Sequence, residues 1–273
     1  MKSFYLFLLV LASTVLTSVG FAAEKDPNVF YGRSFSSDGD TLFYRVMYPN
    51  GYADNTKKKY PLVLVLHGAD AFSKKGQRYN AKQLKSPVAE LFTQKAVKDS
   101  FPAIVLYPQC EEGDSWAGMS ASKQNDVIPF PENPEQTYSG ELLEGMVKYY
   151  IKHYPVDENR IYIIGLGSVG GSGALDLAAR KPKYFAAVVS LGGAINPERT
   201  KALRKMPLRL YSSESMVDVP LTLVRDVYIE LQAAGAKFCD PVFELGEISE
   251  EEMVRTAANS KGFLRWIFTQ KRK

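Results

Sequence analysis

Two glycine-rich segments hold the residues whose types and spacing could support chemistry. The segment Gly165–Gly171 reads Gly-Leu-Gly-Ser-Val-Gly-Gly and joins a strand-like run to a helix-like run. One interpretation is a phosphate-binding loop, because the N–H groups at a helix N-terminus attract anions. Gly165, Gly167 and Gly170 have the spacing of a dinucleotide loop, but the segment lies past mid-chain and no strand-end acid follows about 20 residues later. The other interpretation is a sharp turn that presents the Ser168 hydroxyl as a nucleophile.

The second segment, Leu66-His67-Gly68-Ala69-Asp70, follows the apolar run Leu62–Leu66. That run is too short for a helix and lacks alternation, which is typical of a strand buried on both faces of a parallel sheet. Sites in open α/β sheets form at the carboxyl ends of the strands. We therefore expect both glycine-rich segments to border the same site.

The rest of the chain alternates between strand and helix patterns. Val29–Phe35 and Leu42–Tyr48 predict an antiparallel hairpin, and Pro241 places the last strand at a sheet edge. The other predicted strands are Ile104–Leu106, Ile161–Ile164, Ala187–Leu191, Leu208–Tyr211 and Lys237–Leu245, and the predicted helices are Ser86–Lys98, Glu141–Lys152, Ala174–Arg180, Leu221–Ala234 and Phe263–Thr269. This order predicts one α/β domain with a single eight-stranded, mostly parallel sheet and the Ser168 turn at its centre.

Composition narrows the class of protein. With 273 residues and 45% hydrophobic content, the chain is neither disordered nor collagenous. The formal net charge is +4, and the only basic runs, Lys57–Lys59 and Lys271–Lys273, are short. We expect no nucleic-acid partner.

The first 22 residues have the layout of a secretory signal peptide. Lys2 precedes the apolar stretch Phe4–Leu16, and small residues follow around Ala22 and Ala23. The alternative is a membrane-spanning helix, but polar residues interrupt the run before the roughly 20 apolar residues that a span requires. We expect cleavage near Ala22, a mature domain over residues 23–273 without a stable membrane span, and a periplasmic or secreted location.

Several stretches between Tyr60 and Arg272 together resemble one family. They are Tyr60–Gly68, Tyr107–Cys110, Gly113–Trp116, Tyr154–Asp157, Arg160–Tyr162, Asp176–Arg180 and Trp266–Phe268. The chain resembles the secreted esterase and predicted-peptidase branch of the α/β-hydrolase superfamily, which is related to feruloyl esterases, polyhydroxybutyrate depolymerases and dienelactone hydrolases. The resemblance implies the α/β-hydrolase fold, serine ester hydrolysis without cofactor or metal, and a small-molecule ester or carbohydrate-linked acyl ligand.

The resemblance also implies roles for individual residues. Ser168 would attack a carbonyl carbon, and the backbone N–H groups of Ala69 and Val169 would form the oxyanion hole. His67 and Gly68 would shape the loop that carries Ala69.

Two aromatic residues would line an acyl or aromatic pocket by the same resemblance, namely Trp116 and Tyr107. For a single aromatic side chain a place in the core is the more common outcome. The implied strand order also places Cys110 and Cys239 about four strands apart, too far for a disulfide.

The turn itself departs from the family pattern Gly-Leu-Ser-x-Gly-Gly, because the chain has an additional residue. Counting around Ser168 puts Leu166 where a small residue normally allows the helix to approach the strand, whereas counting from Gly165 puts Gly167 where the serine belongs. Either the turn is distorted or the nucleophile has been lost.

The acid and the base are altered as well. Asp218 stands closer to Pro220 than the pattern requires, Glu214 is a substitute, and both can equally be solvated loop residues. The triad order in this fold is nucleophile, acid and then histidine, but His67 and His153 both precede Ser168. The expected histidine region, Gly246–Glu252, offers only acids and serine, among which Glu247 or Glu251 could serve as a base if burial raised its pKa.

These departures leave three hypotheses. The first is a pseudoenzyme of the serine ester hydrolase family, with weak or no hydrolysis and with the cleft retained for ligand binding. The second is an active serine esterase that uses an unusual base. The third is a structural or partner-binding protein that retains only the fold.

Overall fold

The computed structural model describes residues 30–53, 57–118 and 130–272. Its core is a single eight-stranded sheet in the order β1-β2-β4-β3-β5-β6-β7-β8. The strands are β1 (Tyr31–Ser37), β2 (Asp40–Met47), β3 (Tyr60–Leu66), β4 (Ile104–Pro108), β5 (Val156–Leu166), β6 (Ala187–Leu191), β7 (Leu208–Ser212) and β8 (Phe243–Glu244). The β1–β2 hairpin is antiparallel and β2 joins β4 antiparallel, whereas the pairs from β4 to β8 are parallel. The expected single, mostly parallel sheet is confirmed.

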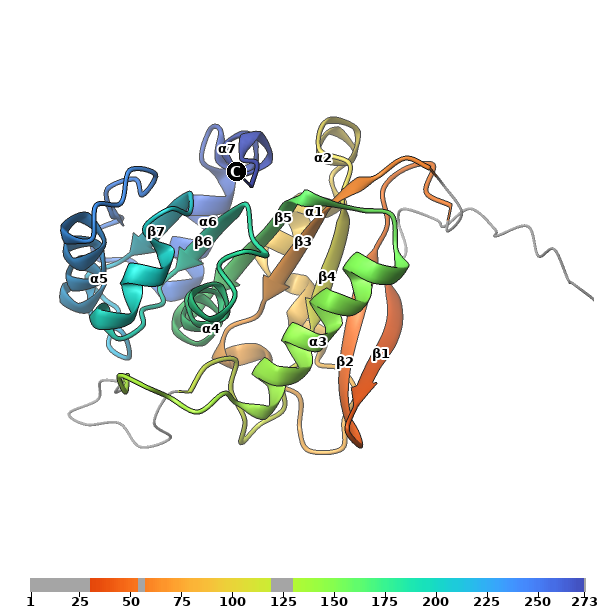
Figure 1. Cartoon of the computed structure of the whole chain (residues 1–273), viewed down its shortest axis with the longest axis horizontal. Coiled ribbons are helices and arrows are strands. Elements are labelled where there is room, and N and C mark those ends of the chain that lie inside the picture. Colours follow the sequence, from red (N-terminus) through yellow and green to blue (C-terminus); the bar gives the residue numbers. More distant parts are fainter. Residues whose placement is uncertain (1–29, 54–56, 119–129, 273) are drawn as a thin grey trace, which may run out of the picture.

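Helices cover both faces of the sheet (Figure 1). Strand β3 is therefore buried on both faces, which explains its apolar run of residues. Leu62, Leu64 and Leu66 pack with α3 (Tyr138–His153), α4 (Gly167–Arg180) and α5 (Leu221–Ala233) on one face. Val63 and Val65 pack on the other face with α1 (Pro87–Thr93), α2 (Lys95–Ser100), α6 (Glu250–Asn259) and α7 (Phe263–Thr269). Three short 3₁₀ helices, η1 (Ala69–Ala71), η2 (Ala81–Lys85) and η3 (Pro197–Leu203), complete the described elements.

Some predicted elements differ from the observed ones. The helix expected over Ser86–Lys98 is two helices, because Gln94 has an extended backbone with ψ of 133°. The last strand is reduced to Phe243–Glu244, preceded by an isolated bridge between Leu208 and Cys239, since Pro241 has no N–H with which to continue the ladder. Helix α4 begins at Gly167 rather than Ala174, and the sequence did not predict α6.

Glycines let α4 lie directly against the carboxyl ends of β3 and β5. A methyl group at Gly165 would overlap the backbone carbonyl of Gly170, and one at Gly170 would lie 2.7 Å from the carbonyl oxygen of His67. On the opposite side of the helix, Gly171 has the same relation to Gly193 after β6, where a methyl carbon would come 2.6 Å from the Gly193 nitrogen. The small residues that the turn needs are therefore spread over two strands and the helix.

A buried carboxylate ties α4 to its surroundings. Asp176 is 2% exposed and accepts a 2.7 Å hydrogen bond from Nε of Arg180 and a second from Arg199 of η3. Arg180 also donates to the carbonyl oxygen of Pro134 at 2.7 Å. Asp176 and Arg180 together thus join α4, η3 and the segment that precedes α3.

The cysteines, the predicted signal peptide and a membrane span were the subjects of three further predictions. Cys110 and Cys239 are free thiols, and they lie beside β4 and β7, which the sheet order separates by four places. The predicted signal peptide lies outside the described residues. Among the helices of the described ranges, none combines the length and apolar character needed to cross a membrane.

Candidate functional site

The turn between β5 and α4 has its left-handed residue at Gly167, not at Ser168. Strand β5 ends at Leu166, and Gly167 has a φ of +67°, a conformation that favours glycine. Ser168 is the next residue, lies in the first turn of α4 and is only 1% exposed. A positive φ at Gly167 fits the alignment of the turn that counts from Gly165.

The carboxylate of Glu250 lies over this turn. Its Oε2 accepts a 3.0 Å hydrogen bond from the Ser168 backbone N–H. A methyl group at Gly167 would overlap Oε1, and a methyl carbon at Gly68 would lie 3.2 Å from the same atom. The Glu250 carboxylate therefore sits between the loop after β3 and the start of α4, where the fold normally forms an oxyanion hole.

Gly167, Asp218 and Glu250 can be compared with a catalytic triad by their order along the chain. In this fold a nucleophile ends the central strand, an acid follows at a later strand and the base comes last. Gly167 ends β5, Asp218 follows β7, and Glu250 follows β8 as the first residue of α6. In this order along the chain, the three elements present a glycine, an aspartate and a glutamate.

The electrostatic surroundings of Glu250 are those of a partly buried acid. Burial raises the pKa of Glu250 above its ordinary value, and the negative charges of Asp70 and Asp218 raise it further. Hydrogen bonds from the backbone and the hydroxyl of Ser168 lower the pKa and so oppose this shift. These contributions bring Asp218 and Ser168, two residues singled out from the sequence, into the surroundings of one carboxylate.

The other acidic candidates lie outside this contact. Glu214, Glu247 and Glu251 are exposed. Glu251 instead forms an ion pair with Arg255 at 3.2 Å on the surface of α6. His153 lies at the far end of β5 from the turn, with its ring 4.6 Å from that of Tyr149.

Ala69 and Val169, the residues expected from the resemblance to form the oxyanion hole, lie in η1 and in the first turn of α4. Ala69 begins η1 and is exposed, so its side of the loop faces outward. Val169 is one residue further along α4 than the N–H that contacts Glu250. The backbone N–H that directly follows Gly167 belongs to Ser168.

His67 holds the loop after β3 through both ring nitrogens. Nδ1 lies 2.8 Å from the carbonyl oxygen of Gly68, and Nε2 accepts a 3.0 Å hydrogen bond from the Cys110 N–H. This pattern requires a neutral ring with its proton on Nδ1. The Trp116 indole N–H donates to the His67 carbonyl oxygen at 3.2 Å, so the loop is bound from both sides.

Trp116 and Tyr107 are core residues on opposite faces of the sheet. Trp116 is 1% exposed and belongs to the core cluster with α3 and α4, whereas Tyr107 is fully buried in the cluster with α1 and α6. The two rings do not line a common pocket.

Acidification is expected to destabilise the protein through His67. Burial lowers the pKa of His67 to about 4, against an ordinary value of 6.5. Because the folded pKa is depressed, the stabilisation is complete above pH 6.5 and is lost as the pH falls from 6.5 towards 4, about 3 kcal/mol in all. Urea unfolding between pH 7 and 4 should show this loss in the parent protein and a smaller one in His67→Asn.

The titration can also be observed directly. The chain has 2 histidines, so His153→Gln leaves a single imidazole signal in the NMR spectrum. A midpoint near 6.5 for that signal would contradict the predicted burial effect.

Gly167 and Glu250 are expected to be energetically coupled. Gly167→Ala should cost roughly 2 to 3 kcal/mol, since it strains a left-handed residue and displaces the carboxylate from the Ser168 N–H. In a Glu250→Ala background only the backbone strain of about 1 kcal/mol remains. A double-mutant cycle by urea unfolding measures the difference, and Glu251→Ala is the matched control. Additive costs would show that the carboxylate does not occupy this space.

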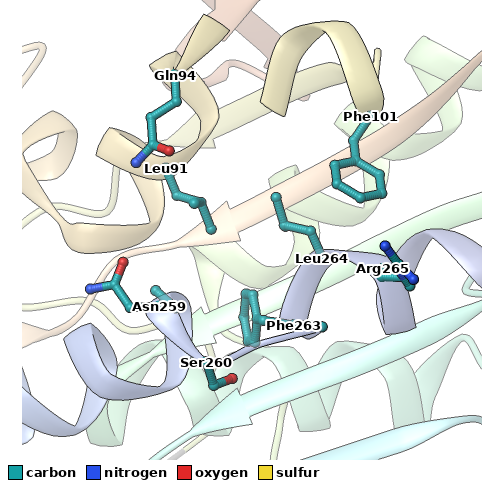
Figure 2. A pocket seen from close by; sticks show the side chains of 10 residues that line it. Leu91, Gln94, Phe101, Asn259, Ser260, Phe263, Leu264 and Arg265 are labelled. Atoms are coloured by element: carbon teal, nitrogen blue, oxygen red, sulfur yellow. The ribbon is translucent and has the colours of Figure 1, made fainter. Parts of the chain in front are cut away.

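A surface groove lies at the other end of α6 (Figure 2). It has a volume of about 360 Å³ and is bordered by Leu91 and Phe101 on one side and by Phe263, Leu264 and Asn259 on the other. Glu250 and Asn259 are the first and last residues of α6, so about 14 Å of helix separates the groove from the turn. Across the described ranges, no cluster of three His, Cys, Asp or Glu residues could hold a metal ion.

Glu250 is the site residue that sequence reasoning missed. The acidic run after the last strand was identified, but Glu247 and Glu251 were preferred over Glu250. One signal was present, because Ser249 and Glu252 have the spacing of a helix capping box, which fixes where the helix begins. The structure confirms this start, with the Ser249 side chain accepting a hydrogen bond from the Glu252 N–H. As the first helical residue, Glu250 is directed differently from Glu251.

Comparison with solved structures defines the class as the α/β-hydrolase fold. A thermostable esterase superposes with a TM-score of 0.72 at 24% identity, over 90% of this chain and 64% of that one, so the present chain spans less than two thirds of its length. A ferulic acid esterase of Anaeromyces mucronatus, solved with ferulic acid, gives 0.60 at 17% identity over 92% and 94% of the two chains. An S-formylglutathione hydrolase of Staphylococcus aureus gives 0.59 at 13% identity over 88% and 98%.

The family follows from the sequence itself. The model of the "Putative esterase" family matches residues 39–238, and the chain belongs to that family. The matched region contains the Gly167 turn and ends before Glu250. No curated protein matches the chain.

Proposed function

We propose that this esterase-family protein is an exported pseudoenzyme that hydrolyses esters weakly or not at all. The observation that carries the proposal is the Glu250 carboxylate, which fills the space beside Gly167 and takes the Ser168 N–H. Catalysis of acyl transfer depends on donors aimed at the developing oxyanion. Here the donor is already occupied, and a carboxylate at that point repels negative charge.

The triad positions support the same conclusion. A triad that has lost one member retains a roughly 10³ to 10⁴-fold acceleration only because its oxyanion hole and binding site remain. In this chain the nucleophile position is a glycine, the base position is an acid, and the oxyanion position is filled. The surface beside this turn would then serve to bind a small-molecule ester or a carbohydrate-linked acyl group.

The experiment is an esterase assay on the purified mature protein with p-nitrophenyl acetate and butyrate, combined with fluorophosphonate labelling. We expect a rate equal to that of a heat-denatured sample and no labelled peptide. A rate near that of ordinary family members, abolished by Ser168→Ala, would refute the proposal.

One observation favours a second candidate, an active serine esterase in which Glu250 is the base. The Ser168 hydroxyl contributes a hydrogen bond to Glu250, and burial raises the pKa of that carboxyl, as general-base catalysis requires. This candidate predicts a fluorophosphonate adduct on Ser168 and a rate lost in both Ser168→Ala and Glu250→Gln. Glu251→Ala, a change of an exposed acid in the same helical turn, is the control.

Export is a separate part of the proposal and has its own test. Expression of the full chain in a bacterium, followed by fractionation and intact-mass measurement, should yield a periplasmic or secreted protein that begins near Ala23. A full-length product confined to the cytoplasm or membrane would count against it.

A further inference from the structure

Glu250 is held by the backbone N–H and the hydroxyl of Ser168 and not by a cation. Within the described part of the chain no lysine or arginine forms an ion pair with it, whereas the exposed Glu251 of the same turn pairs with Arg255. What Glu250 contacts is the Ser168 N–H at 3.0 Å, at the N-terminus of the 14-residue helix α4. The N-terminal N–H groups and the helix dipole together stabilise a negative charge at that point.

The space around the Glu250 carboxylate exists because two neighbouring residues are glycines and have no side chain. Gly167 and Gly68 lie on two different segments, and a methyl group on Gly167 would overlap Oε1 while one on Gly68 would be 3.2 Å from it. Ser168 is 1% exposed and Gly68 is buried, so the carboxylate end of Glu250 reaches into the protein. The site thus has a donor, room for two oxygen atoms and little solvent.

We propose that this space is a carboxylate-binding site which the chain fills with its own Glu250, and that a free small carboxylate binds there when that side chain is removed. Glu250 therefore acts as an internal ligand that closes the oxyanion position to any other anion. The proposal goes beyond the loss of hydrolysis, because it states what the position recognises and what excludes other ligands from it.

The surrounding charges set the class of ligand. Asp70 of η1 and Asp218 after β7 both act on the Glu250 carboxylate unfavourably, and Asp70 Oδ1 lies 3.5 Å from the methyl position on Gly68, so a second negative charge in this space would be repelled. A monoanion such as acetate or formate meets this requirement, whereas a doubly charged phosphate does not.

The test follows the Ser168 backbone amide by ¹H–¹⁵N NMR during titration with sodium acetate, at an ionic strength held constant with sodium chloride. In Glu250→Ala the amide should show a saturable downfield shift, and thermal stability should rise with acetate. The parent protein and Glu251→Ala should show neither effect. No saturable shift in Glu250→Ala, or an equal shift in the parent, would overturn the proposal.

A second measurement uses the parent protein, so its main result does not depend on whether a destabilised variant folds. In the parent protein the Ser168 amide shift should titrate with the Glu250 carboxyl, with a midpoint above the ordinary value for glutamate, and Glu250→Gln should abolish this titration. An amide that does not respond to pH would overturn the proposal. Ester hydrolysis is assayed separately. A measured rate would therefore refute the proposed function, whereas the acetate and pH titrations of the Ser168 amide alone decide whether the carboxylate site exists.

Discussion

Gly165→Ala is expected to cost at least about 3 kcal/mol of unfolding free energy. The added carbon would overlap the carbonyl of Gly170 and approach the Cα of Gly171. These are backbone atoms of α4, so no side chain can rotate to relieve the overlap, and the helix must move away from β3 and β5. Overpacking without an available rearrangement is strongly destabilising.

Urea unfolding followed by circular dichroism measures the loss. Gly235→Ala is the matched control, because Gly235 has a φ of +80° but no atom within 4 Å of the added methyl position. Its cost should be that of backbone strain alone, about 1 to 2 kcal/mol. If Gly165→Ala were no more destabilising than Gly235→Ala, α4 would not be in close contact with β5.

Asp176→Ala is expected to destabilise the protein by roughly 3 to 5 kcal/mol. Asp176 is 3% exposed as a side chain, and its partners Arg180 and Arg199 are 20% and 16% exposed. Removing the carboxylate leaves two largely buried guanidinium groups without their anion, which costs more than the ion pairs contribute. Asp176→Asn keeps one acceptor oxygen and should lose less.

The same measurement on Glu251→Ala provides the comparison for Asp176. Glu251 also pairs with an arginine, but the two side chains are 78% and 49% exposed, so the expected loss is below about 1 kcal/mol. Equal losses for the two variants would mean that the Asp176 network is solvated and contributes little.

The sheet could be predicted from the sequence because its signals are local. Runs such as Leu62–Leu66 and Ala187–Leu191 contain only residues that a doubly covered strand accepts, and both strands are fully buried. Gly235 follows the end of α5 with a φ of +80°, the left-handed conformation for which glycine is preferred after a helix. Boundaries failed where a tertiary contact decides them, as at Gln94, where the chain is extended between two helices.

The site was only partly predictable, for a physical reason. The sequence left two alignments of the turn open, because residue type alone does not reveal which residue takes a positive φ. The role of Glu250 depends on packing between segments that are 82 positions apart, so no local pattern encodes it. The sequence does show that no histidine follows Ser168, and this directs attention to the acidic run that contains Glu250.

The shortness of β8 has a consequence for how copies of this protein behave at high concentration. A sheet edge with unpaired N–H and carbonyl groups is a template for adding a strand from another molecule. At this edge only Phe243 and Glu244 form a strand, and Pro241 supplies no N–H just before it. Arg225 also spans to Glu244 with two hydrogen bonds of 2.8 and 2.7 Å, which places a charged pair beside the edge. This edge therefore offers little to intermolecular β-pairing, a property that protects the folded protein against aggregation.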